Sequence, residues 1–257
     1  MSYALITGAS KGIGKEIALQ LAQKKHNLLL IARSEEILHQ LKLEIEKKYG
    51  VKVDYLAIDL TQNNVAQQIL QWVETKQYKV NILINNAGFG LAGRFEAYPY
   101  AKTADMMQIN MQTLTELCYV FLPMLKAQSK SYILNIASST AYQAIPNMSV
   151  YAATKVYVLY FSRGLKMELK DTSVSVTVIS PGATDTNFND VAQIGEKARE
   201  QAKKVTMSPQ EVAQISIESM FAEKTEVVPG FINKLGKLLV WLAPKSLTEK
   251  VAKGIYE

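Results

Sequence analysis

Short apolar runs alternate with helical patterns along almost the whole chain. The runs fall at residues 3–6, 28–31, 53–58, 82–84, 132–136 and 174–179, and a shorter one stands at 227–228. Several of them are continuously apolar rather than alternating, which is typical of parallel strands that are covered on both faces. We therefore predict a strand at each run.

Helical periodicity fills the intervals between these runs. In residues 35–49, for example, one helical face carries Ile37, Leu38, Leu41 and Ile45. Repeated strand–helix units predict an α/β protein with a doubly wound, Rossmann-type parallel sheet and helices on both faces. No linker or low-complexity segment divides the 257 residues, so we expect a single domain over 1–257.

The bulk properties argue against several classes of protein. The lysines behind the net charge of +6 are scattered over amphipathic helices, and no nucleic-acid-binding motif accompanies them. No apolar run approaches the roughly 20 residues that span a bilayer. The only two histidines, His26 and His39, suggest no metal site.

Two further features bear on the location of the protein. The single cysteine, Cys118, excludes an internal disulfide and fits a reducing compartment. Met1 leads directly into the first apolar run, which leaves no room for a signal peptide. We expect a cytoplasmic protein.

A glycine-rich turn joins the first run to the first helix. Residues 7–14 read TGASKGIG, and Ile17, Ala18, Leu21 and Ala22 follow with helical spacing. Glycines let the backbone turn sharply and approach a pyrophosphate without an intervening Cβ. The free N–H groups at the start of a helix favour the negative charge. The segment predicts a dinucleotide-binding turn.

A second motif carries the chemistry. Tyr151 and Lys155 stand one helical turn apart and share a face, and Ser138 lies thirteen positions upstream. An ammonium beside a phenol favours the phenolate. A tyrosine in such a place can donate or accept a proton at a reacting oxygen.

The strand pattern brings these motifs together. Ligands of an open parallel sheet bind beyond the carboxyl ends of its strands. Six residues follow predicted strands directly and should line one rim: Gly8, Arg33, Asp59, Asn86, Ser138 and Pro181.

In its motifs and their order, the chain resembles the short-chain dehydrogenase/reductase family. The resemblance runs from Thr7 to about Thr186. It implies a glycine motif at 7–14, an adenine-binding pair at Asp59-Leu60, and the fourth-strand motif at 85–88. It also implies a nicotinamide-binding segment at 181–186 and a catalytic tetrad of Asn110, Ser138, Tyr151 and Lys155.

The residues after the second strand bear on the choice of nucleotide. NAD-dependent enzymes usually place an acidic side chain here to bind the ribose 2′-hydroxyl. This chain has Ala32, followed by Arg33 and Ser34, which suit a 2′-phosphate, and Lys11 adds a second cation. We therefore expect NADP(H). The full expected cofactor set is Gly8, Ser10, Lys11, Gly12, Ile13, Gly14, Arg33, Ser34, Asp59, Leu60, Asn86, Ala87, Gly88, Tyr151, Lys155, Pro181, Gly182, Thr184 and Thr186.

The implied activity is NADPH-dependent reduction of a hydrophobic ketone or aldehyde. Tyr151 would protonate the carbonyl oxygen, Ser138 would hydrogen-bond it, Lys155 would hold the nicotinamide ribose, and Asn110 would order a water relay. An apolar pocket wall is expected from Phe89, Ala144, Ile145, Met148 and Phe188. Two alternatives stay open: a membrane-associated 3-ketoacyl or lipid carbonyl reductase, and a non-catalytic NADP(H) redox sensor.

Two segments near the end of the chain stand apart. The polar stretch 189–207 follows the nicotinamide segment and is expected to be a substrate lid. In 231–257, one helical face carries Phe231, Ile232, Leu235, Leu238, Leu239 and Leu242 before Pro244. This face could close the core, join an oligomer or lie on a membrane, and the first two are preferred. We expect a homo-oligomer.

Overall fold

The computed structural model describes residues 2–186, 188, 192, 195, 199–200 and 205–256, with the side chains of all of these except 255–256. Most of the predicted lid, 189–207, therefore lies outside the described residues.

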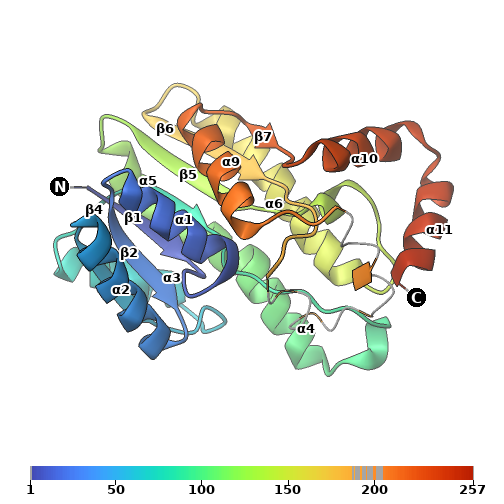
Figure 1. Ribbon diagram of the computed structural model, residues 1–257, viewed down its shortest axis with the longest axis horizontal. Helices are drawn as coiled ribbons and strands as arrows, with labels where there is room; N and C mark the ends of the chain where they lie inside the picture. Colours follow the sequence, from blue (N-terminus) through green and yellow to red (C-terminus); the bar gives the residue numbers. More distant parts are fainter. Residues whose placement is uncertain are drawn as a thin grey trace.

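A seven-stranded parallel sheet forms the centre of the molecule (Figure 1). Its order is β3-β2-β1-β4-β5-β6-β7, so the chain winds outward in both directions from β1 and β4. The predicted doubly wound α/β sheet is confirmed. The strands are β1 (Ser2–Thr7), β2 (Asn27–Ala32), β3 (Val53–Ala57), β4 (Lys79–Asn85), β5 (Ser131–Ile136), β6 (Val174–Ile179) and β7 (Glu226–Val227).

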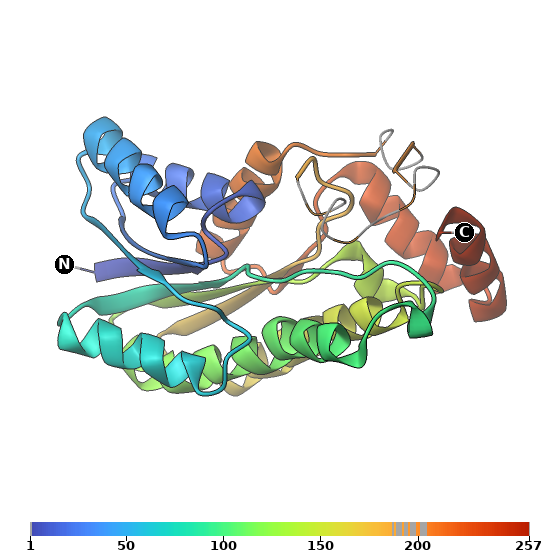
Figure 2. The same cartoon turned by 90° about the horizontal axis from the view of Figure 1, so that it is seen from below.

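Helices cover both faces of the sheet (Figure 2). One face carries α1 (Gly12–Gln23), α2 (Glu35–Tyr49) and α9 (Pro209–Phe221), and the other carries α3 (Val65–Thr75), α4 (Tyr100–Met107), α5 (Thr113–Lys126) and α6 (Ser149–Glu168). Two helices follow β7: α10 (Phe231–Leu242) and α11 (Lys245–Tyr256). Short helical turns stand at η1 (Phe95–Ala97), η2 (Gln108–Gln112) and η3 (Ser139–Tyr142).

The continuous apolar runs are explained by two cores, one on each side of the sheet. In β1, Tyr3 and Leu5 pack into the core under α3, α5 and α6, whereas Ala4 and Ile6 pack into the core under α1, α2 and α9. Successive strand residues point to opposite faces, so both sets must be apolar.

Helix α2 follows its predicted bounds, with one departure at its apolar face. Leu38, Leu41 and Ile45 are buried, and Gly50 ends the helix in the left-handed conformation at φ +65°. Ile37 was placed on the same face, but it is 44% exposed. It lies about 100° around the helix from Leu38 and turns toward solvent.

Candidate active site

Helix α6 carries the tyrosine and the lysine of the predicted tetrad on its buried face. Tyr151 and Lys155 are both almost fully buried, and the Lys155 Nζ lies 5.8 Å from the centroid of the Tyr151 ring. The same Nζ donates a hydrogen bond to the Ile136 carbonyl oxygen, 3.0 Å away at the end of β5. Burial lowers the pKa of Lys155 from 10.5 to about 8. Lys155 therefore loses its proton more readily than an exposed lysine does.

Ser138 follows β5 and caps the turn η3. Its Oγ accepts a hydrogen bond from the Thr140 backbone N–H at 3.2 Å. The backbone next to it is fixed as well, because the Ser139 N–H donates to the Pro181 carbonyl oxygen at 2.7 Å. The loops that follow β5 and β6 are thus tied together beside Ser138.

Asn110 lies in η2, a π-helical turn between α4 and α5, and its side chain acts as a brace. The Nδ2 donates to the Phe89 carbonyl oxygen at 2.9 Å and to the Thr154 Oγ1 at 3.0 Å, and the Oδ1 accepts from the Phe89 N–H at 3.1 Å. Thr154 in turn donates to the carbonyl oxygen of Tyr151 at 2.7 Å. Both amide hydrogens are therefore used within the protein.

The expected role of Asn110 in a water relay stays a prediction, and its side-chain amide hydrogens are already used within the protein. Asn110 is 1% exposed and does not line the cavity that holds Tyr151. A single π-turn inside a helix is common at functional sites. Here the π-turn places the Asn110 side chain between the loop after β4 and helix α6, and its hydrogen bonds to Phe89 and Thr154 connect the two.

The glycine turn has the tight backbone that the motif predicts. Gly8 and Gly12 adopt φ of +67° and +58°, which only glycine adopts at no steric cost. A Cβ on Gly14 would stand 2.3 Å from the Gly8 carbonyl oxygen. Gly14 therefore packs closely against the backbone of Gly8, and it does not line the cavity.

Thr7 and Asn86 hold this turn against β4. The Thr7 Oγ1 accepts from the backbone N–H groups of Asn86 and Ala87 at 3.0 and 3.1 Å. The Asn86 Nδ2 donates to the carbonyl oxygens of Thr7 and Gly8 at 3.0 and 3.2 Å. This role of Thr7 could not be predicted from the sequence, because a threonine at a strand end carries no signal of such a bond.

The end of β2 offers a cationic surface without an acid. Arg33 is exposed next to Ala32, and no described carboxylate lies within ion-pair distance of it. Helix α1 begins beside it without a side-chain cap and without an acid in its first turn. Beyond β3, the Asp59 carboxylate accepts from the Thr61 N–H and Oγ1 at 3.0 and 2.9 Å.

The segment after β6 closes the other side. Thr184 pairs with Met207 as an isolated parallel bridge. A Cβ on Gly12 would lie 3.2 Å from the Thr186 Cγ2, so this segment passes directly over the glycine turn. The predicted nicotinamide segment and the predicted pyrophosphate turn thus face each other.

One cavity of about 600 Å³ joins these groups. Its lining includes Ser138, Tyr151, Lys155 and every predicted cofactor residue except Gly14. It also includes residues outside the expected catalytic, cofactor and pocket-wall sets: Ile58, Thr61, Leu91, Lys102, Asp105, Ile109, Ile136, Ala137, Ser139, Thr140 and Ala183.

This cavity has the features that a nicotinamide dinucleotide requires. The glycine turn leaves space that Cβ atoms would fill, and the N-terminus of α1 favours a pyrophosphate. The exposed Arg33 guanidinium, which has no carboxylate partner among the described residues, lines the same cavity. A sequence model of the short chain dehydrogenase family matches residues 2–197.

The chain belongs to this family.

Known proteins agree with the short-chain dehydrogenase assignment. An uncharacterized oxidoreductase of Staphylococcus epidermidis is 30% identical over 202 residues, which cover 79% of this chain and 86% of that protein. A 7beta-hydroxysteroid dehydrogenase of Clostridium sardiniense is 25% identical and covers 98% of this chain and 89% of its own length. Very-long-chain 3-oxoacyl-CoA reductase-A of Danio rerio is 31% identical over 70% of this chain, which spans only 57% of that protein.

Solved structures share the fold. A structure described for its 7beta-hydroxysteroid dehydrogenase stereoselectivity superposes with a TM-score of 0.88 at 23% identity, covering 98% of this chain and 96% of that chain. A short-chain dehydrogenase from Sphingobium yanoikuyae in complex with NADPH reaches 0.82 at 27% identity, covering 96% and 98%. The protein is therefore an oxidoreductase of the short-chain dehydrogenase family, which acts on hydroxyl and carbonyl groups.

The wall of the cavity next to Tyr151 carries apolar side chains in this dehydrogenase. Met148 and Phe188 line the cavity, and the Phe188 ring lies 5.4 Å from that of Tyr151. Phe89 also lines it, whereas Ile145 is buried in the cluster behind. Ala144 was expected in this wall, but it is exposed and lines neither cavity described here.

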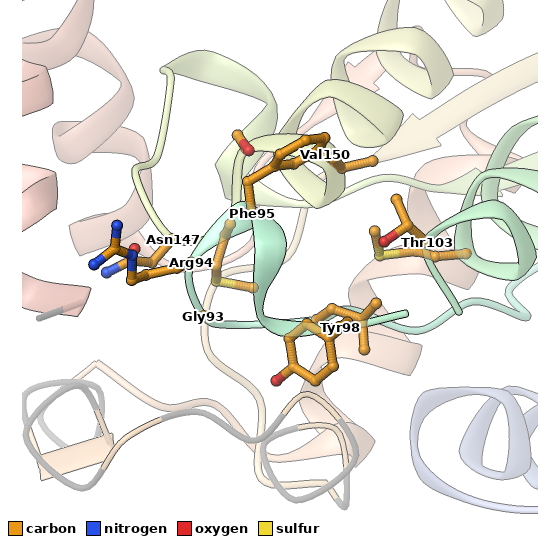
Figure 3. Close-up of a pocket in the computed structure, with 11 residues that line it drawn as sticks. Gly93, Arg94, Phe95, Tyr98, Thr103, Asn147 and Val150 are labelled. Atoms are coloured by element: carbon orange, nitrogen blue, oxygen red, sulfur yellow. The ribbon is translucent and has the colours of Figure 1, made fainter. Parts of the chain in front are cut away.

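A second, much smaller cavity of about 20 Å³ lies behind this wall (Figure 3). Residues from the loop after β4, from α4 and from the start of α6 surround it, among them Tyr98, Thr103 and Val150. Its volume is close to that of one water molecule. It therefore offers the short-chain dehydrogenase no room for a substrate.

Proposed function

We propose that this short-chain dehydrogenase is an NADPH-dependent reductase of a hydrophobic ketone or aldehyde. One observation carries the proposal: a single cavity joins Tyr151 and Ser138 to the exposed Arg33. A proton donor, a second hydroxyl and a cation suited to a 2′-phosphate are the groups that this reaction needs.

The preference for NADPH rests on the end of β2. Ala32 offers no carboxylate to a ribose 2′-hydroxyl, and Arg33 has no ion-pair partner among the described residues. A guanidinium binds phosphate in a bidentate manner. Lys11, exposed at the start of α1, adds a second cation to the same cavity.

The geometry around α6 supports the catalytic roles that we propose. Tyr151 would give its proton to the carbonyl oxygen while the Ser138 hydroxyl hydrogen-bonds the same atom. Lys155 would keep a positive charge beside the phenol and offer its other donors to the ribose of the nucleotide. The nucleotide, when bound, would supply the hydride.

The expected substrate is largely apolar. Met148, Phe188 and Phe89 surround the side of the cavity next to Tyr151 and offer it few polar partners. Relatives named as a hydroxysteroid dehydrogenase and a very-long-chain 3-oxoacyl-CoA reductase support a steroid-like or long-chain carbonyl compound.

The decisive experiment follows nicotinamide absorbance while a panel of steroid, long-chain and aromatic ketones and aldehydes is offered with NADPH. We expect turnover that Tyr151→Phe reduces by about 10²–10⁴-fold, because general acid catalysis contributes that much. NADPH affinity should be largely unchanged in the variant. Saturable NADPH binding without turnover of any carbonyl would favour a redox sensor instead.

A further proposal concerns self-association, and exposed aromatic side chains on α5 and α6 support it. Tyr119 and Tyr160 are 79% and 66% exposed. Each lies one turn from the Thr115–Tyr157 hydroxyl contact of 2.9 Å, which joins the two helices. We propose that this face joins two copies of the chain, since aromatic residues are enriched in interfaces.

A further inference from the structure

The outer face of α10 is apolar and uncovered. No residue of this helix is buried, so it does not close the core, which was one of the two preferred expectations beside an oligomer interface. Phe231 is 80% exposed, and the apolar side chains that share its face are also exposed: Ile232, Leu235, Leu238, Leu239 and Leu242. Together these six side chains form a stripe about 120° wide along the helix. We call them the α10 apolar face.

The opposite face of α10 is firmly attached to the body of the molecule. Asn233 packs against Gly182, where an added Cβ would come within 2.4 Å of its Oδ1. One turn later, Lys237 forms an ion pair with Glu226 and lies 4.7 Å from the centroid of the Tyr142 ring. Tyr142 also donates to Glu226 at 2.8 Å. These contacts fix which side of α10 points outward.

The charge around the α10 apolar face is positive. Helices α10 and α11 contain five lysines and a single glutamate over 231–256. Lys234, Lys245 and Lys250 are exposed, and no described carboxylate lies within ion-pair distance of any of them. Trp241, 74% exposed, stands at the border of the face next to Lys234.

We propose that the α10 apolar face binds the surface of an anionic lipid bilayer. A helix with a Leu- and Phe-rich face bordered by Trp and Lys is suited to lie in the interface between headgroups and acyl chains. Each lysine near an anionic surface adds to the attraction. No described helix is both long enough and apolar enough to cross a membrane, so the contact is peripheral.

A second copy of the chain fits this face less well. The helix has 12 residues and is about 18 Å long. Its apolar face would bury on the order of 300 Å² per partner, well short of the ~800 Å² per partner of a standard interface. Two such faces would also bring lysines against lysines. A bilayer requires neither a large complementary surface nor an acidic partner.

The position of α10 determines which end of the molecule would lie next to the bilayer. The helix lies beyond the carboxyl ends of the strands, at the end of the sheet that holds the cavity (Figures 1 and 2). Through Gly182, a cavity residue, it touches the segment after β6. A bilayer bound at α10 would therefore lie next to the substrate end of the molecule.

Flotation of the full-length protein with lipid vesicles tests the proposal. We expect it to float with phosphatidylcholine vesicles that contain about 30 mol % phosphatidylglycerol, and less with pure phosphatidylcholine. Leu235→Glu/Leu239→Glu should lower the bound fraction about tenfold or more, because both side chains leave the acyl region. Ile37→Glu/Leu43→Glu, at equally exposed positions on α2, adds the same charge and should still float.

Two results would overturn the proposal. The first is no flotation of the wild type with anionic vesicles, and the second is an equal loss in both double variants. If the wild type does not float, a fall in molar mass by light scattering for Leu235→Glu/Leu239→Glu alone would make α10 a self-association surface. The proposal does not rest on the proposed function, since flotation measures no turnover.

Discussion

Lys155 is a buried ammonium whose burial has a cost that depends on pH. Among the described residues its ammonium donates a hydrogen bond to the Ile136 carbonyl oxygen alone, and burial lowers its pKa from 10.5 to about 8. Below about pH 8, the folded chain holds an ionised lysine that is better solvated in the unfolded chain. That penalty decreases as pH rises from about 8 toward 10.5, because the folded state has already lost the proton.

Lys155→Met is therefore expected to stabilise the nucleotide-free protein. At about pH 7 the free energy of unfolding should rise by roughly 1–3 kcal/mol, and the gain should shrink at about pH 10. Urea unfolding at both pH values measures this, with Lys47→Met, at an exposed position on α2, as control. A variant that is less stable at neutral pH would contradict the argument, and turnover should be lost in either case.

Arg33 is expected to decide between the two nicotinamide nucleotides. A hydrogen bond to a charged group contributes roughly 1.5–3 kcal/mol, so Arg33→Ala should weaken NADPH binding about ten- to a hundred-fold. NADH binding should change little. Titration calorimetry with both nucleotides checks this, and Lys47→Ala serves as the exposed cationic control. Equal losses for both nucleotides would mean that Arg33 does not contact a 2′-phosphate.

At the scale of single residues, the sequence predicted the reactive side chains better than the residues that hold them in place. Tyr151, Lys155 and Ser138 stand in motifs whose spacing is visible in the chain, and the structure places all three in one cavity. Thr7 and Thr154 make bonds to residues 79 and 44 positions away. Such contacts depend on how β4 and η2 are placed in space, which no local pattern records.

At the scale of elements, the glycine turn leaves no room for a Cβ atom at Gly14. A Cβ at Gly14 would stand 2.3 Å from a backbone oxygen and 2.4 Å from the Asn86 Nδ2, so the turn must move to accept it. By contrast, Gly164 in α6 has no described atom within 4 Å of an added Cβ.

Gly14→Ala should therefore lose nucleotide binding while the sheet stays folded. Saturating nucleotide at about 100 times its Kd stabilises a protein by about 2.7 kcal/mol, and the variant should lose this shift in thermal unfolding. Gly164→Ala should keep it and should be more stable by about 0.5–1 kcal/mol, because alanine is the better helix former. A normal nucleotide shift in Gly14→Ala would show that the turn tolerates the methyl group.

The strands could be predicted well because two buried faces leave a strong signal. Their first residues were predicted less well: β4 starts at the polar Lys79, before the apolar run 82–84, and β7 starts at the polar Glu226 rather than at Val227. Its pairing with β6 and the bond from Tyr142 to Glu226 favour that start. The π-turn η2 was not predicted, since one extra residue in a helical turn barely disturbs the apolar periodicity.

At the scale of the whole molecule, the proposed interface on α5 and α6 can be tested directly. Tyr119→Arg/Tyr160→Arg places two cations in the proposed contact, where like charges would face each other across the two-fold axis of a dimer. We expect the molar mass measured by light scattering to fall by about half or more. Tyr100→Arg, at a 71% exposed position on α4, should leave it unchanged. An unchanged mass in the double variant would place any interface elsewhere.

The reversal of strand order between β1 and β4 divides the site between the two halves of the chain. Residues near the expected adenosine lie before β4, as Arg33 and Asp59 do, whereas those around the reacting carbonyl follow it, as Tyr151 and Phe188 do. Substitutions after β2 can therefore change the preferred nucleotide without disturbing the apolar pocket, and the reverse also holds. Cofactor preference and substrate preference are then separate heritable traits, which selection can adjust one at a time.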